Sequence, residues 1–155
     1  GEPIPAEIVE RIIAAQNYLA AYLNVRQLSF GLTDMAWHTI TEPFEGDVEQ
    51  FEVASMAPSQ VQPVVPGTAM APAFGHIFSG GYAAGYYGYK WAEVLEADAF
   101  SLFKEKGIFN REVSGSFREN ILSKGGTEHP MELYVRFRGH KPETKALIEK
   151  MGLGK

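Results

Sequence analysis

Apolar residues recur every three or four positions along most of this chain, and this helical period constrains its fold more than any other feature. No segment alternates apolar and polar residues over a useful length, so strands are not expected. The sequence therefore predicts an all-α fold of about seven helices. These are expected from Pro5 to Leu23, from Val25 to near Pro43, and over 47–54, 83–106, 111–123, 130–138 and 142–151.

The chain is of ordinary size and composition for one globular unit. It has 155 residues, of which 45% are hydrophobic and 21% are charged, so we expect a single helical unit over 1–155. Residues 56–73 have neither period and are rich in proline, which predicts an irregular loop. A loop of this length more often serves a site or packs against another part of a larger protein.

Charge and composition exclude several classes of partner and chemistry. A net charge of -5 gives no electrostatic footprint for nucleic acid or for an anionic membrane. The chain has no cysteine, which rules out disulfides and thiolate ligands. It has no apolar run long enough to span a membrane and no signal peptide at its start, so we expect a cytoplasmic protein. It opens without an initiator methionine, as a fragment or processed chain would.

The most unusual stretch is 76–89, where four glycines and four tyrosines fall within residues 80–89. Gly80 and Gly81 can adopt positive φ and allow another chain to approach closely. They predict a flexible strap that leads into the long helix expected at Ala83.

Tyrosines follow the strap at helical spacing. Tyr82, Tyr86 and Tyr89 are four and three positions apart, which predicts one shared helix face. Phenols are neutral donors near pH 7 and can hydrogen-bond a carbonyl oxygen or a developing oxyanion. His76, just before the strap, would add another donor.

Two other interpretations of this stretch remain open. Tyrosines at helical spacing also pack the edge of a core with their hydroxyls in water, and a glycine-rich loop is often only a turn. A phosphate cradle is disfavoured because the loop has no Lys followed by Ser or Thr and follows no strand.

Residues 74–100, FGHIFSGGYAAGYYGYKWAEVLEADAF, closely resemble the signature near the C-terminal end of the thimet oligopeptidase family, in its oligopeptidase A and peptidyl-dipeptidase group. The resemblance extends to both sides and covers nearly the whole chain. It includes Val25-Arg26-Gln27-Leu28-Ser29-Phe30, Asp34-Met35-Ala36-Trp37-His38-Thr39, Phe117-Arg118, Gly125-Gly126-Thr127 and Phe137-Arg138-Gly139.

The resemblance implies a C-terminal helical subdomain of a larger zinc metallopeptidase that hydrolyses short peptides. Family members bind zinc through an H-E-x-x-H helix and a downstream glutamate. None of the four histidines here begins that motif, because they are followed by Thr39, Ile77, Pro130 and Lys141. The zinc ligands are therefore expected in the remaining N-terminal part of the enzyme. The isolated chain is expected to hold no metal or other cofactor and to be inactive.

The resemblance also implies roles for individual residues. Tyr89 is expected to stabilise the oxyanion, while Tyr82 and His76 hold the substrate. The further substrate-binding residues implied by the family pattern are Gly80, Gly81 and Tyr86. Arg138 would dock a free C-terminal carboxylate, as a peptidyl-dipeptidase requires, although an arginine at a helix end is equally expected to be structural.

The remaining polar residues are weaker candidates for a site, and other functions stay open. His38 and Glu42 stand four apart, but no third metal ligand is visible. Glu93, Glu96 and Asp98 are interpreted as a solvated helix face, with a general acid–base pair as the alternative. Both an endo-cleaving oligopeptidase and a dipeptide-releasing enzyme fit the pattern. The chain could also be a stand-alone, non-catalytic peptide-binding module.

Overall fold

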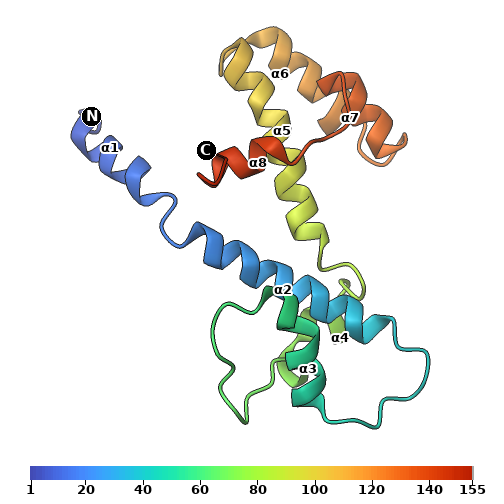
Figure 1. The fold of residues 1–155 in the computed structure, drawn as a ribbon. Helices are drawn as coiled ribbons and strands as arrows, with labels where there is room; N and C mark the ends of the chain where they lie inside the picture. The colour runs from blue at the N-terminus through green and yellow to red at the C-terminus, as the bar shows by residue number, and fades with distance from the viewer. Residues whose placement is uncertain (155) are drawn as a thin grey trace. The chain divides into compact units, whose positions relative to one another are not determined.

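The computed structural model describes residues 1–154 as helices joined by turns and loops, with no strand among them (Figure 1). This confirms the all-α prediction, with eight α-helices in the described residues where about seven were expected. The helices are α1 (Ala6–Ala15), α2 (Ala20–His38), α3 (Val48–Met56), α4 (Gly75–Phe78), α5 (Gly88–Lys106), α6 (Arg111–Phe117), α7 (Pro130–Arg138) and α8 (Lys145–Lys150).

The chain divides into two compact units, Gly1–Lys90 and Trp91–Lys155. Helix α5 begins in the first unit and continues into the second. This division does not test whether the units fold separately, so the expectation of one helical unit over 1–155 stays a prediction.

The first predicted helix is interrupted. Instead of running from Pro5 to Leu23, α1 ends at Ala15 and α2 begins after Leu19, which adopts a left-handed φ of 56°. A bulky residue in this conformation cannot continue a right-handed helix. The apolar period continues through residues 16–19, so periodicity alone placed the break between the two helices too late, after Leu23. The predicted break before Val25 is absent, and α2 continues to His38.

Acidic side chains on α3 hold the segment 56–73. The Glu52 carboxylate, which is buried, accepts the backbone N–H groups of Met70 at 2.7 Å and Ala71 at 2.6 Å. Glu49 accepts the N–H of Gly67 at 2.8 Å. Two 3-10 turns, η1 (Ala57–Ser59) and η2 (Ala71–Ala73), lie within this segment. The expected third helix is confirmed, with Asp47 as its N-cap.

The C-terminal unit packs α5, α6 and α7 around one apolar core. Asn110 caps α6 by accepting two backbone N–H groups, and the π-helix η3 (Arg118–Leu122) continues from α6. Helix α7 has the predicted bounds and ends at Gly139, whose φ is 88°. The buried residues of this core are Ala99, Val113, Tyr134 and Phe137, with Phe103 and Phe117 packed against them. A second buried cluster joins Val94 and Ala97 of α5 to Leu147 of α8.

Candidate functional site: the tyrosine loop

The candidate site is the tyrosine loop, residues 79–87, between α4 and α5 in the N-terminal unit. The sequence predicted that the long helix would begin at Ala83, but residues 81–87 form successive turns and α5 begins at Gly88. Ala84 has a φ of 53°, which is outside the helical region. Tyr82 and Tyr86 therefore do not lie on a helix, and the prediction that helical spacing gives one shared face was wrong.

The four aromatic residues named from the sequence nevertheless come together. The rings of Tyr82 and Tyr89 stack with centroids 5.1 Å apart, and Tyr86 meets Tyr89 edge-on at 5.1 Å. The ring of His76 lies 5.9 Å from that of Tyr82 and 6.2 Å from that of Tyr86. Such edge-on and offset pairs are the favourable arrangements of aromatic rings. We call these four residues the tyrosine cluster.

The hydroxyls of the cluster differ in their availability. Tyr89 is 40% exposed, and Tyr82 and His76 are exposed as well. The pKa of the Tyr89 phenol is raised above its usual value, mainly by the hydrogen bond with Tyr82 and to a smaller extent by desolvation. A phenol is neutral near pH 7, so the exposed Tyr89 hydroxyl is a hydrogen-bond donor.

Tyr86 is the inner member of the cluster. Its hydroxyl donates to Oε1 of Gln27 at 3.1 Å, and burial raises the pKa of the phenol against the opposing effect of Arg26. Its ring also packs edge-on against Phe30 and Phe74. Tyr86 thus links the cluster to the core of the N-terminal unit.

The two glycines of the strap are under different constraints. A Cβ on Gly80 would lie 2.8 Å from the backbone carbonyl oxygen of His76, so the α4 backbone would have to move. A Cβ on Gly81 would meet nothing within 4 Å. Gly80 is therefore needed for the close approach of the loop to α4, whereas Gly81 borders open space.

A carboxylate on α2 that the sequence did not identify anchors the tyrosine loop. Asp34 on α2 is 1% exposed, and its carboxylate accepts the N–H of Ala84 at 2.9 Å and the N–H of Tyr86 at 2.8 Å. Nδ1 of His38 lies 2.8 Å from Oδ1 of the same carboxylate. Nothing in the sequence hinted at this anchor, because the apolar residues Leu28, Leu32 and Met35 predicted a different buried side of α2, and the structure exposes them while it buries Asp34.

Arg138 is engaged within the C-terminal unit. Its side chain is 12% exposed, Nε donates to the carbonyl oxygen of Asp98 at 3.0 Å, and Nη2 donates to Oγ of Ser101 at 2.8 Å. The carboxylates of Asp98 and Glu105 lie 3.6 and 3.7 Å from the guanidinium. This geometry favours the structural interpretation, and carboxylate docking by Arg138 stays a prediction.

Asp98, which the sequence placed on a solvated helix face, is instead buried. It accepts the Tyr134 hydroxyl at 2.5 Å, and burial together with this bond raises the pKa of Tyr134. The prediction of a wholly solvated acidic face was therefore wrong at Asp98. Glu96 pairs at the surface with Lys150 at 2.6 Å.

No group of three or more candidate ligands comes together within residues 1–154 to hold a metal ion. His38 is turned to Asp34, not to Glu42. The donor set present therefore does not fit zinc. None of the helices described is long and apolar enough to cross a membrane.

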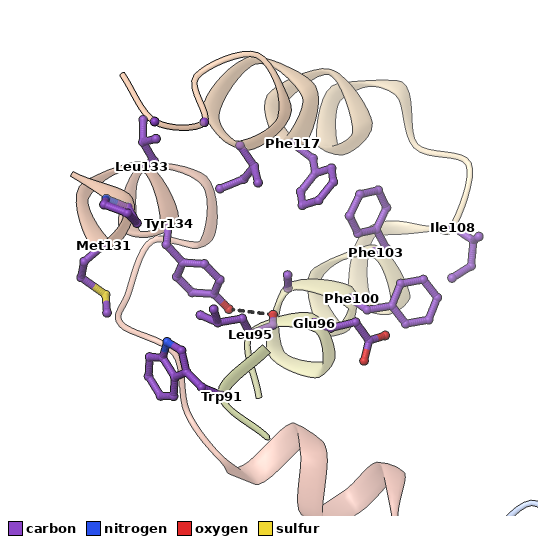
Figure 2. A pocket seen from close by; sticks show the side chains of 15 residues that line it. Trp91, Leu95, Glu96, Phe100, Phe103, Ile108, Phe117, Met131, Leu133 and Tyr134 are labelled. Carbon is purple, nitrogen blue, oxygen red and sulfur yellow. Dashed lines mark hydrogen bonds between the residues drawn. The ribbon is translucent and has the colours of Figure 1, made fainter. Parts of the chain in front are cut away.

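The C-terminal unit contains an apolar pocket of about 650 Å³ between α5, η3 and α7. Figure 2 shows Phe103, Phe117 and Tyr134 directed into it. The Tyr134 hydroxyl, which donates to Asp98, also lies 3.3 Å from the carbonyl oxygen of Leu95. A ligand site normally adds a few converging polar groups to an apolar wall. Here the polar side chains that line it, Glu96 and Tyr134, are already bonded elsewhere. The pocket therefore resembles a packing surface more than a substrate site.

Comparison with known proteins gives a consistent result. The model of Peptidase family M3 matches residues 1–153. Oligopeptidase A of Escherichia coli (strain K12) is 49% identical over 99% of this chain, and "Probable cytosolic oligopeptidase A" of Arabidopsis thaliana is 39% identical over 99%. Dipeptidyl carboxypeptidase of Salmonella typhimurium is 37% identical over 99%. The chain spans only 23%, 22% and 23% of the length of these three proteins.

Proposed function

Because this chain belongs to Peptidase family M3, we propose that it is the substrate-facing part of a zinc-dependent oligopeptidase that hydrolyses short peptides. The observation that carries the proposal is the tyrosine cluster, in which the exposed Tyr89 contacts the rings of Tyr82 and Tyr86. A peptide carbonyl gains negative charge on its oxygen as water adds to it. A preorganised phenol stabilises that charge with little reorganisation.

The cluster supports a division of labour among its members. Tyr89 would donate its phenolic hydrogen to the oxygen that becomes negative. Tyr82 and His76 are exposed beside it and would hold the substrate backbone. Tyr86, whose proton is donated to Gln27, would position Tyr89 through their edge-on ring contact.

The remaining part of the enzyme is the proposed partner of the exposed apolar surface. The pocket in Figure 2 is lined by uncharged residues apart from Glu96. Phe109, which follows the lining residue Ile108 in the sequence, is 95% exposed. The stripe of α1, including Ile8 and Ile12, is also exposed. Contiguous apolar patches are uncommon on the surface of monomers. A chain that spans about a quarter of its relatives' length would bury such surfaces against the rest of the protein.

Zinc is a property of the family and is proposed here for the longer enzyme. Zinc-dependent peptidases use the metal to activate water and polarise the carbonyl. Among the described residues no three candidate ligands come together, so we propose that the zinc ligands lie in the rest of the enzyme. A cytoplasmic location also stays a prediction, because one Arabidopsis relative is named cytosolic and another, equally similar, is named organellar.

Among the M3 activities, oligopeptidase is favoured over dipeptide release. Identity to oligopeptidase A of Escherichia coli is 49%, against 37% to the dipeptidyl carboxypeptidase of Salmonella typhimurium. The engagement of Arg138 within the C-terminal unit points the same way, because a dipeptide-releasing enzyme needs a cation for the substrate's carboxylate.

The proposal predicts a clear difference between the isolated chain and the longer protein. The longer protein should hydrolyse an internally quenched peptide and lose that activity to a chelator, whereas chain 1–155 should neither hydrolyse it nor keep zinc after dialysis. Fluorescence assays and metal analysis of both proteins test this. Hydrolysis by chain 1–155 would contradict the division of the site between the two parts. Such hydrolysis would mean that the chain works as a stand-alone protein, and it would also exclude the alternative of a non-catalytic peptide-binding module.

Substitution of Gly81 tests the strap without disturbing the fold. Because a side chain there points into open space, Gly81→Val should leave the melting temperature of the longer protein within about 2 °C and raise KM for peptides roughly 10-fold. Gly80→Val is the matched comparison. Its side chain would meet the His76 carbonyl, so that variant should lose stability as well. Unchanged KM in Gly81→Val would argue against substrate contact at the strap.

A further inference from the structure

The Asp34 carboxylate joins α2 to the middle of the tyrosine loop. One oxygen accepts the N–H of Ala84 and the other accepts the N–H of Tyr86, at 2.9 and 2.8 Å. These positions are 50 and 52 residues away along the chain. A buried carboxylate requires such donors, and charge-assisted bonds to backbone N–H groups are among the stronger hydrogen bonds in proteins.

The anchor fixes a backbone that local preferences do not favour. Ala84 has a positive φ of 53°, a conformation that is uncommon for residues other than glycine. Strained residues of this kind persist where surrounding interactions over-determine them. Here the bond from Ala84 to Asp34 and the second bond from Tyr86 determine both sides of Gly85.

This backbone sets the direction of the catalytic candidates. Tyr86 donates its own N–H to Asp34, and its ring meets that of Tyr89 at 5.1 Å. Tyr82, on the other side of Ala84, stacks on Tyr89 at 5.1 Å. Tyr89 therefore contacts the ring of Tyr86, whose backbone is anchored directly, and the ring of Tyr82, which lies two residues before the anchored Ala84.

We propose that Asp34, oriented by His38, is a positioning residue that holds the tyrosine loop so that Tyr89 is aimed at the substrate. The inference rests on the proposed function of Tyr89. Asp34 itself is 1% exposed, so its side chain is not accessible to a substrate. It acts through the loop backbone, so its loss should displace the phenol of Tyr89 without removing it.

A double-mutant cycle in the longer protein tests whether Asp34 acts through Tyr89. Asp34→Asn keeps the size of the side chain but replaces one accepting oxygen with a donor that opposes a backbone N–H. Alone it should lower kcat about 30-fold, because a misplacement of about 1 Å can cost two orders of magnitude. In a Tyr89→Phe background the same change should lower kcat by less than about twofold. An equal loss in both backgrounds would overturn the proposal.

Glu52→Gln is the matched control for a purely structural role. Glu52 is also a buried carboxylate that accepts two backbone N–H groups, from Met70 and Ala71, but it holds a different segment. It should lower the melting temperature much as Asp34→Asn does. Its effect on kcat should be small and the same with Tyr89 or Phe at position 89. If the two variants behaved alike in the cycle, Asp34 would be only a structural residue.

Amide hydrogen exchange tests the anchor independently of catalysis and of any variant that fails to fold. In the unmodified protein the amides of Ala84 and Tyr86 should exchange at least about 100-fold more slowly than unprotected amides. Fast exchange at both would overturn the anchor. Slow exchange combined with an unchanged kcat in Tyr89→Phe would instead refute the role of Tyr89 in the proposed function.

Discussion

Tyr89→Phe in the longer protein should lower kcat about 100- to 1000-fold and leave KM within about twofold. Phenylalanine keeps the ring that stacks on Tyr82 and meets Tyr86, so the cluster should retain its packing. The phenolic hydroxyl is lost, and with it the hydrogen bond to Tyr82. A donor that meets the oxygen only as charge develops contributes to the transition state and not to substrate binding.

Tyr87→Phe is the control for the Tyr89 substitution. Tyr87 is a neighbouring, exposed phenol of the same loop, and it takes part in no ring contact found among residues 1–154. It should leave kcat unchanged. Steady-state kinetics of both variants on one short peptide provide the measurement. If Tyr89→Phe kept a normal kcat, the cluster would be interpreted as the edge of a core.

Arg138→Gln should lower the free energy of unfolding of chain 1–155 by about 3 kcal/mol. The guanidinium is nearly buried and bonds the Asp98 carbonyl and Ser101. Its loss leaves the buried Asp98 carboxylate with the Tyr134 hydroxyl and without its neighbouring cation. Urea unfolding followed by circular dichroism measures the change.

The same variant in the longer protein distinguishes a structural arginine from one that docks substrate. A structural role predicts that the activity on peptides with a free C-terminus and on their C-terminal amides falls by the same factor. A selective loss on the free acids, with normal stability, would contradict the structural role and support carboxylate docking. Arg136→Gln is a suitable control, since Arg136 pairs at the surface with Glu128 at 2.7 Å.

Elements with local signals were predictable from the sequence. Helix α7 has its predicted bounds because Pro130 suits the first turn and Gly139 supplies the left-handed end. Helix α3 follows from its Asp47 cap. In both cases the residues that define the ends lie within the segment itself, so no distant contact is needed to place them.

Elements decided by distant contacts were not predictable. The sequence around Ala83 has helical spacing, yet Asp34, 50 residues earlier, takes the N–H of Ala84 and the loop leaves the helical path. The same contact explains how the tyrosine cluster forms on a loop. The sequence named the four aromatic residues of the cluster, but it attributed the proximity of the three tyrosines to a helix face and placed His76 before the strap. It gave no reason to connect them to α2.

The tyrosine loop is held unevenly, and this has a thermodynamic consequence for substrate capture. Asp34 fixes the half that contains Ala84 and Tyr86, while Gly81 borders open space. Ordering one backbone residue costs roughly 1–2 kcal/mol. A peptide that binds to this loop as proposed would find the backbone of Ala84 and Tyr86 already ordered by folding. The entropic cost of ordering that part of the proposed binding surface is therefore met before the peptide arrives.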